Sequence, residues 1–464
     1  MLRIRILLCA LLTCAALGAG AVGAAPTVAS HNEALFFEGS TTLLSPKTRE
    51  HAIAQLQHLG VSSLRVELYW VDVAPSPKSS RRPTFDATNP ASYNWGGYDW
   101  LLAKAKQLNW PVLLTVTGPV PRWATSTHRD YVTRPNALQF QQFMTAVGRH
   151  YNSEVSLYAI WNEPNHPDFL MPQFVRRSAA SPRIYRELFQ AGYSGLQAAG
   201  IVQPKVLMGE TAPTGTARVV APLAFLRGVL CLNARYRRSS TCGSLPAYGY
   251  AHHAYTKAAG PSYVPPNPDD VMISVIPRLT RALDLAARAH AIKAGMKVYL
   301  TEFGIQSKPN RFLGVPVSQQ AEFDAIAERI AWSNPRVAAF SQYLLRDDPL
   351  GGRPGSAVIG FQTGLEYVNG KPKPLYFGFP VPLVVSRQGH GFSLWGLVRP
   401  AKGATKVKVL VQRKGSRRYR TLKVVQTNSL GYWTLRSSTR GAHWRVSWRS
   451  PSGAVYTGPP IAAS

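Results

Sequence analysis

The sequence has few cysteines, and this limits the chemistry that it can carry. Cys231 and Cys242 are the only two beyond the N-terminal segment that is expected to be removed. Neither has a His or Cys neighbour at the spacing of a zinc site, so no metal site is expected. In an exported chain, two cysteines eleven residues apart permit one disulfide that closes a short loop. Two unpaired thiols are the alternative.

Long apolar runs are also lacking after the N-terminus. Arg3 and Arg5 precede an apolar stretch over 6–17, and small residues at 22–24 suit cleavage, so residues 1–24 are expected to be a signal peptide. An uncleaved anchor is the alternative, but glycines break the run. A lipoprotein signal at Cys14 lacks the small residue expected before the cysteine. No later run reaches the roughly 18 apolar residues of a membrane span, so we expect a secreted protein with no transmembrane span in the mature chain.

Acidic residues are missing from the C-terminal region. The formal net charge is +30, and residues 380–464 contain fifteen Lys and Arg but no Asp or Glu. Such a charge favours an anionic partner: an acidic cell-wall polymer, an acidic polysaccharide or a membrane surface. The alternative is a background of generally basic secreted proteins. Nucleic acid is not expected, because the chain is exported and contains no DNA-binding helix motif.

With 45% hydrophobic and 16% charged residues, the chain has the composition of a globular protein. After the signal peptide, apolar β-rich runs alternate with stretches of helical period. The predicted strands are 35–39, 63–70, 111–117, 157–161, 205–209, 247–255, 297–301 and 337–344. The predicted helices are 46–59, 98–108, 136–151, 184–199, 223–230, 270–294 and 318–333.

These alternating units predict an α/β fold. Strands that are apolar without strict alternation suit a parallel sheet buried on both faces, and eight of them over residues 30–378 predict a (β/α)8 TIM barrel. A doubly wound open sheet is the alternative. Such a sheet usually has a glycine-rich phosphate-binding turn after its first strand, and Glu38-Gly39-Ser40-Thr41 is not one.

The composition changes at about residues 372–382. Short alternating runs separated by turn residues follow, at 392–398, 406–412, 419–426, 431–437 and 443–448. They predict a small all-β sandwich over residues 380–464. Its tryptophans are expected to form the core of this domain; they are Trp395, Trp433, Trp444 and Trp448.

Catalytic side chains of a TIM barrel lie at the C-terminal ends of its strands. Acidic residues are common at the predicted strand ends. They are Glu38, Glu67, Glu163, Glu210 and Glu302, with Asp347 and Asp348 after the last strand. Cleavage of a glycosidic bond needs two carboxyl groups that face each other across that bond. Two of these acids, Glu163 and Glu302, lie in recognisable motifs.

Glu163 stands in Trp161-Asn162-Glu163-Pro164-Asn165 after the fourth predicted strand, and Glu302 in Thr301-Glu302-Phe303-Gly304 after the seventh. Over residues 30–378 the sequence resembles the clan A retaining glycoside hydrolases, with families 5 and 39 the most similar. The resemblance implies that Glu163 is the general acid/base and Glu302 the nucleophile. Metals and other cofactors are not required by this chemistry.

The resemblance also implies roles for four neighbours. Asn162 matches the residue that binds the sugar 2-hydroxyl, and Arg65 matches an arginine beneath the nucleophile. His253 and Tyr255 match a His-x-Tyr pair that lines the cleft, with the tyrosine on the nucleophile. His252 is the alternative histidine, and Glu67 and Glu210 are expected to support the catalytic pair.

The two roles need different proton affinities. The acid must hold a proton near neutral pH, so we expect the pKa of Glu163 to be raised beside Trp161. The nucleophile must be ionised, so we expect Arg65 to keep the pKa of Glu302 low. A retaining mechanism predicts carboxyl groups about 5 Å apart.

Substrate contacts are less well defined by the sequence. Trp70 and Trp123 are expected to stack on sugar rings, and Trp95 either does so or packs between helices. Many clan members have a tryptophan after the eighth strand, whereas this chain has Gln342 and Tyr343, one of which is expected to replace that contact. Arg122 and Arg346, together with the basic C-terminal region, suggest an acidic or wall-derived glycan.

The sequence thus predicts an O-glycosidase acting on an extracellular polysaccharide or glycoside. One alternative is a barrel that has lost activity and only binds carbohydrate or cell wall. Another is a transglycosylase, which shares the covalent intermediate but passes it to a second sugar.

Overall fold

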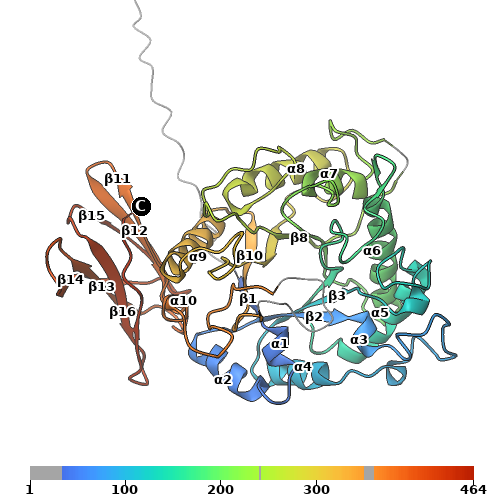
Figure 1. Cartoon of the computed structure of the whole chain (residues 1–464), viewed down its shortest axis with the longest axis horizontal. Helices are drawn as coiled ribbons and strands as arrows, with labels where there is room; N and C mark the ends of the chain where they lie inside the picture. Colours follow the sequence, from blue (N-terminus) through green and yellow to red (C-terminus); the bar gives the residue numbers. More distant parts are fainter. Residues whose placement is uncertain (1–33, 240–241, 350–359, 464) are drawn as a thin grey trace, which may run out of the picture.

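The computed structural model describes residues 34–239, 242–349 and 360–463. The predicted signal peptide at residues 1–24 lies outside these ranges. Two bodies lie side by side in Figure 1, a large α/β barrel and a smaller all-β domain.

The larger body is a closed barrel of parallel strands (Figure 1). Around the barrel, the strands are ordered β1-β10-β9-β8-β7-β4-β3-β2. Their bounds are β1 Ala34–Glu38, β2 Leu64–Tyr69, β3 Val112–Thr117, β4 Leu157–Ile160, β7 Val206–Thr211, β8 Gly249–His253, β9 Val298–Glu302 and β10 Val337–Tyr343. The (β/α)8 prediction is therefore confirmed.

Helices surround the barrel. They are α1 Ser40–Leu43, α2 Arg49–His58, α3 Trp70–Val73, α4 Gly97–Gln107, α5 Ala137–Tyr151, α6 Ser181–Ala198, α7 Pro222–Val229, α8 Ile276–Arg288, α9 Val317–Trp332 and α10 Pro374–Gly378. All six residues of β3 are buried, as expected for a strand with side chains packed both inside the barrel and against the helices. Three 3₁₀ turns (Pro90–Ser92, Arg122–Ala124, Ile273–Val275) and a hairpin of β5 Phe174–Val175 and β6 Ser178–Ala179 lie in the connections.

The eighth helix is shorter than predicted. The pattern suggested residues 270–294, whereas α8 begins at Ile276 and ends at Arg288. Pro277 lies in its first turn, where a residue without an N–H is tolerated, and the chain before it forms a 3₁₀ turn. The hydrophobic period continued past both ends because the flanking residues Val271 and Ile292 are also buried.

The smaller body consists of a three-stranded sheet, β11-β12-β15, and a four-stranded sheet, β14-β13-β16-β17. Its strands are β11 Leu383–Gln388, β12 Gly391–Leu397, β13 Lys406–Gln412, β14 Tyr419–Gln426, β15 Tyr432–Ser437, β16 His443–Arg449 and β17 Val455–Thr457. This confirms the all-β prediction and adds β11 and β17 to it. The core role of the four tryptophans is confirmed as well, because each is at most 3% exposed.

Helix α9 joins the two bodies. Ala325 of α9 belongs to a buried cluster with Trp395 and Tyr432 of the small domain, and Trp332 packs against both rings at 5.7 Å. The guanidinium of Arg399 donates two hydrogen bonds of 3.0 Å to Glu328, and both side chains are buried. An apolar contact and a buried ion pair therefore fix the β domain to the barrel.

The structure contains the Cys231–Cys242 disulfide, so the bridge is confirmed rather than the pair of free thiols. In the described ranges, no helix has the length and apolar character needed to cross a lipid bilayer.

Replacing Arg399 by Met should lower the free energy of unfolding by about 3 kcal/mol, because Glu328 would be left as a buried carboxylate without its partner. Urea denaturation of the full chain measures this. Lys406→Met removes a charge from an exposed position in the same domain and should change stability by less than about 0.5 kcal/mol. Equal stabilities of the two variants would contradict the importance of the pair.

Candidate active site

The predicted site residues meet at the C-terminal end of the barrel. Glu302 is the last residue of β9, the seventh barrel strand, and Glu163 follows β4, the fourth. Glu38 ends β1, while Arg65 and Glu67 lie on β2. Parallel strands bring their carboxyl ends to one rim, so residues that are far apart in the sequence converge there.

Arg65 lies at the centre of this group. Its guanidinium donates to Glu210 at 2.8 and 3.2 Å, to Glu302 at 3.2 Å and to the Asn162 Oδ1 at 3.0 Å. It also pairs with Glu38, and Glu67 lies 3.5 Å away. One side chain that is 1% exposed thus orients residues from five barrel strands or the turns that follow them.

Four carboxyl groups around one guanidinium cannot all be ionised at low cost in a buried site. Burial raises the pKa of Glu38 well above its ordinary value, repulsion from Glu67 adds to this, and Arg65 opposes it. Burial alone would lower the pKa of Arg65, but Glu210 and Glu38 raise it, so the guanidinium is charged. The crowding of buried carboxyl groups therefore raises the proton affinity of Glu38 even beside Arg65.

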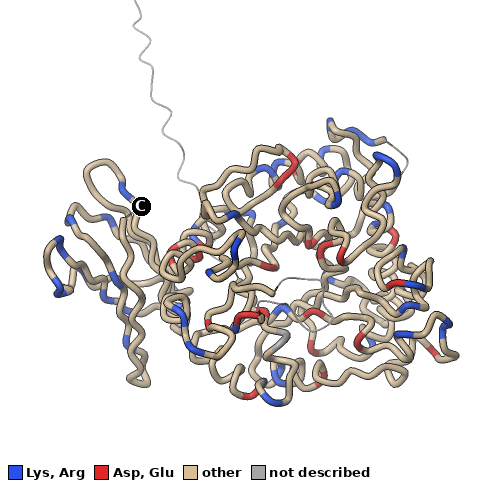
Figure 2. Tube along the Cα trace, viewed as in Figure 1, with Lys and Arg blue, Asp and Glu red and all other residues tan. Residues whose placement is uncertain are grey.

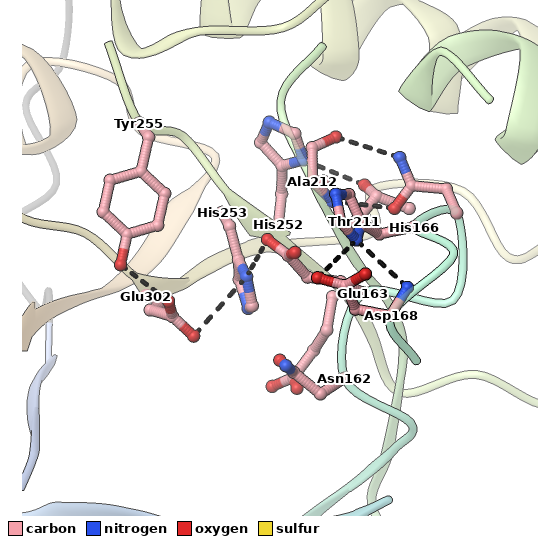
Figure 3. A network of polar contacts seen from close by, with 12 residues as sticks. Asn162, Glu163, His166, Asp168, Thr211, Ala212, His252, His253, Tyr255 and Glu302 are labelled. Atoms are coloured by element: carbon pink, nitrogen blue, oxygen red, sulfur yellow. Dashed lines mark hydrogen bonds and ion pairs between the residues drawn. The ribbon is translucent and has the colours of Figure 1, made fainter. Parts of the chain in front are cut away.

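His253 lies between the two predicted catalytic glutamates (Figure 3). Its Nδ1 is 3.0 Å from Glu163 Oε1 and 3.6 Å from Glu302 Oε2. These two oxygens are therefore no more than about 6.6 Å apart, a separation reached only if the nitrogen lay on the line between them. Tyr255 donates a 2.6 Å hydrogen bond to the other oxygen of Glu302.

The pKa values of the pair differ from the expectation. Burial favours a raised pKa for Glu163, but the hydrogen bond and the charge of His253 outweigh it, and the pKa is lowered. Burial raises the pKa of Glu302, although His253 and Arg65 oppose this. The prediction of a raised pKa for Glu163 and a low pKa for Glu302 is wrong for the free enzyme, because it placed His253 in the cleft without considering its charge.

The pKa shifts of the pair favour the proton on His253 instead of on Glu163. Burial would lower the pKa of His253, but Glu302 and the hydrogen bond to Glu163 raise it above its ordinary value. A cationic His253 beside an ionised Glu163 carries the same total charge as a neutral pair with the proton on Glu163. The two groups therefore titrate as one unit.

His252, the alternative histidine, has a structural role. It is fully buried, and its ring contacts Thr211 Oγ1 at 2.9 Å and the Val271 carbonyl oxygen at 2.8 Å. Burial lowers the pKa of His252 to about 4, so it is neutral. Because successive side chains of a strand point to opposite faces, only His253 of β8 points at the glutamates.

The backbone at the site is in an unusual conformation. Trp161, Glu163 and Glu210 have φ values of 70°, 37° and 46°, in the left-handed region that side chains other than glycine rarely adopt. The amide of Glu163 donates to the Glu210 carbonyl at 3.0 Å, and the Trp161 indole N–H donates to the Phe169 carbonyl at 3.0 Å. Such strain is held by surrounding contacts and concentrates at functional sites.

Trp70 and Trp123 do not provide platforms for sugars, so this prediction is wrong. They are 1% and 2% exposed, and their rings pack against one another at 5.8 Å. Phe143 stacks on Trp70 at 5.1 Å. Trp95 also packs, at 4.6 Å from His150. These rings form an aromatic core next to the site because the loop after β2 folds over α5 with its apolar side inward.

Gln342 and Tyr343, the two candidates for the missing tryptophan contact, differ in their surroundings. Gln342 is fully buried and donates to the Thr363 and Tyr343 carbonyls at 3.1 Å, so it holds the chain after β10 in place and does not replace the missing tryptophan. Tyr343 fits the role of the missing tryptophan better, because it is the last residue of β10 and is only half-buried. Its pKa is raised well above the ordinary value by burial and by the charges of Glu38 and Glu302, so it lies close to both glutamates.

The remaining charged candidates are structural. Arg346 pairs with Glu366 at 3.1 Å, and Arg122 donates to the Lys78 and His128 carbonyls. Asp347 accepts a 2.6 Å hydrogen bond from the buried Lys373, and Asp348 accepts one from the amide of Phe361. Arg346 and Asp347 are thus ion-paired, whereas Arg122 and Asp348 are held by hydrogen bonds to the backbone.

Tyr69 is a site residue that the sequence analysis missed. Its hydroxyl donates a 2.8 Å hydrogen bond to Glu67, and its pKa is raised well above the ordinary value by burial and by Glu67. Arg65, Glu67 and Tyr69 are spaced two residues apart on β2, so their side chains share the inner face of the strand. Applying this period to the sequence would have identified it.

No protein-family profile and no curated protein matches this sequence. Among solved structures, a glucosidase from Croceicoccus marinus has a TM-score of 0.52 and 11% identity, covering 89% of this chain and 94% of that one. A family 39 glycoside hydrolase from Bacteroides cellulosilyticus WH2 has a TM-score of 0.49 and 14% identity, with 82% and 76% covered. At these identities the likeness to the glucosidase concerns the fold, which agrees with the expected barrel of the clan.

The proton shared by His253 and Glu163 can be tested directly. In a Glu163→Gln variant the pKa of His253 should fall, because the carboxylate that stabilises the imidazolium is gone. NMR titration of the labelled histidines measures it. Glu187→Gln, at an exposed position on α6, should leave the titration unchanged. An unaltered His253 pKa in Glu163→Gln would show that the pair does not share the proton.

Proposed function

We propose that this protein is an exported retaining glycoside hydrolase in which Glu302 is the nucleophile and Glu163 the general acid/base. In the first step a Glu302 oxygen attacks the anomeric carbon, while Glu163 gives a proton to the glycosidic oxygen and the bond to the leaving group breaks. In the second, Glu163 takes a proton from water, whose oxygen attacks the same carbon and releases Glu302.

The observation that carries this proposal is the separation of the two carboxyl groups. Both contact the same nitrogen of His253, which limits the distance between those oxygens to about 6.6 Å. Retaining enzymes have about 5–5.5 Å between the groups, and inverting enzymes about 6.5–9.5 Å, because a water must fit between acid and base. The limit of about 6.6 Å between these two oxygens agrees with the closer, retaining spacing and overlaps the inverting range only at its lower end.

The surroundings of Glu302 support its role. Tyr255 and Arg65 donate to its two different oxygens, so both donors favour the ionised form. They also fix the orientation of the carboxylate before the substrate arrives, and such preorganisation costs nothing during the reaction.

His253 supplies the proton store that the acid requires. A sugar ring entering between the glutamates excludes water from the pair, and an ion pair in a drier site is less stable than its neutral form. Transfer of the proton from His253 Nδ1 to Glu163 Oε1, 3.0 Å away, makes Glu163 the acid when it is needed. Asn162, held by Arg65, is then positioned for the sugar 2-hydroxyl.

Export is part of this proposal. The N-terminal pattern of basic, apolar and small residues suits a signal peptide, and the Cys231–Cys242 disulfide suits an oxidising compartment. The proposed substrate is accordingly an extracellular polysaccharide or glycoside. The glucosidase whose fold is similar agrees with a glycosidase function, but a shared fold does not imply a shared function, and the proposal depends on Glu163 and Glu302.

Mechanism-based labelling tests the nucleophile. A panel of activated 2-deoxy-2-fluoro glycosides should form a stable ester on Glu302, because the fluorine slows its hydrolysis, and peptide mass mapping locates the ester. A Glu302→Gln variant should lose activity on the best substrate by roughly 10³-fold or more.

The matched control is Glu50→Gln, which neutralises an exposed glutamate of α2 and should retain full activity. Undiminished turnover by Glu302→Gln would sink the assignment. If the wild type is active but product analysis finds only sugar transferred to a second sugar, the protein is a transglycosylase instead.

The pH profile tests the Tyr255 contact. Activity requires ionised Glu302 and is lost as the pH falls through its pKa, which burial already raises. Tyr255→Phe removes a donor that favours the carboxylate, so the acidic limb of kcat/KM should move to higher pH. Tyr151→Phe removes a hydroxyl bound to Asp99 on the outer helices and should leave the limb in place. Coincident limbs in Tyr255→Phe and wild type would contradict the assigned role.

A further inference from the structure

One end of the small domain contains a groove that the proposed reaction does not use. The groove has a volume of about 450 Å³ and is lined by the turn between β11 and β12, by Lys414 of the β13–β14 turn and by the loop before β16. The hairpin of β11 and β12 contributes Arg387, Gly389, His390, Gly391 and Phe392, and the loop before β16 contributes Arg440 and Gly441.

The charge of this groove is of one sign. Arg387, Lys414 and Arg440 line it, are exposed and form no ion pair within the part of the chain that the structure describes. Since residues 380–464 contain no Asp or Glu, no side chain of the domain can supply a counter-ion. In Figure 2 the small domain carries lysines and arginines but no acidic residues, whereas the barrel carries residues of both charges.

The floor and walls of the groove are held by the core. Phe392 is 7% exposed, packs on Trp444 at 4.9 Å between ring centres, and has the guanidinium of Arg387 above its ring at 5.8 Å. A side chain at Gly441 would overlap Trp444 and Val411, so only glycine lets this loop lie so close. The cations are therefore presented from loops that are packed against the sandwich.

The positive surface continues beyond the groove. The β13–β14 turn that provides Lys414 also carries Arg413, Arg417 and Arg418, all exposed. A single small anion would need only the groove. The further cations on this turn suit a ligand whose negative charges repeat along a chain.

We propose that this groove binds a linear anionic polysaccharide through its carboxylate or phosphate groups and so keeps the catalytic barrel on its substrate. Guanidinium groups bind such anions in bidentate geometry. A concave site suits a polymer chain better than a flat bilayer. That the polymer is a polysaccharide rests on the proposed function, whereas the anion site itself does not.

Binding by the full chain tests the groove. The probes are oligogalacturonate for carboxylates, a phosphodiester-linked polysaccharide for phosphates, neutral dextran, and vesicles containing phosphatidylglycerol, each measured by calorimetry or sedimentation in 0.15 M salt. The groove variant is Arg387→Gln/Lys414→Gln/Arg440→Gln. The control variant, Lys402→Gln/Lys406→Gln/Lys423→Gln, loses the same charge from exposed positions outside the groove.

We expect one of the anionic polymers, but not dextran, to bind the wild type, with affinity falling as salt rises. The groove variant should bind it at least about tenfold more weakly and the control variant less than about threefold. The anionic polymer that binds identifies the group. Equal losses in the two variants, binding to neither polymer, or a preference for vesicles would overturn the proposal. Because the groove is distinct from the barrel site, turnover of a small glycoside should be unchanged in both variants, so failure here does not test Glu302.

Discussion

The site depends on a single buried cation. Arg65 contacts Glu38, Glu210 and Glu302, and Glu67 lies 3.5 Å away. One positive charge is therefore shared by four carboxyl groups. Two consequences follow from this shortage of positive charge. The pKa of a carboxyl such as Glu38 is raised, and every additional donor near the rim, including His253 and Tyr255, favours the ionised form of the carboxyl group that it contacts.

This excess of carboxyl groups explains why His253 is important. Burial alone would lower the pKa of His253, but Glu302 and Glu163 raise it above its ordinary value. The lowered pKa of Glu163 and the raised pKa of His253 therefore favour the proton on His253, whose Nδ1 lies 3.0 Å from Glu163. A site with a larger share of positive charge would hold no such proton, and one without Arg65 would leave the carboxyl groups unpaired and strongly destabilising.

Much of the fold was predictable, for a local reason. Each barrel strand is a short run of apolar residues between turn signals, and each helix has its own period, so the eightfold alternation is visible without knowledge of tertiary contacts. The wrong predictions concern residues that are buried for a reason that the sequence period does not show. Val271 and Ile292 extended the apparent helix α8 because they are buried outside it, and Trp70 and Trp123 looked like sugar platforms because a sequence does not reveal which side of a loop is covered.

By itself, the sequence determined the strand count and thereby placed Glu163 after the fourth strand and Glu302 at the end of the seventh, which requires them to meet at one rim. It also determined that residues 380–464 have no acidic side chain. The tertiary structure alone decided which of His252 and His253 faces the glutamates, and that Arg65 is shared among several carboxyl groups. It also decided that Arg387, Lys414 and Arg440 converge on one groove. Electrostatic coupling depends on distances through space, and residues separated by tens or hundreds of positions acquire those distances only when the chain folds.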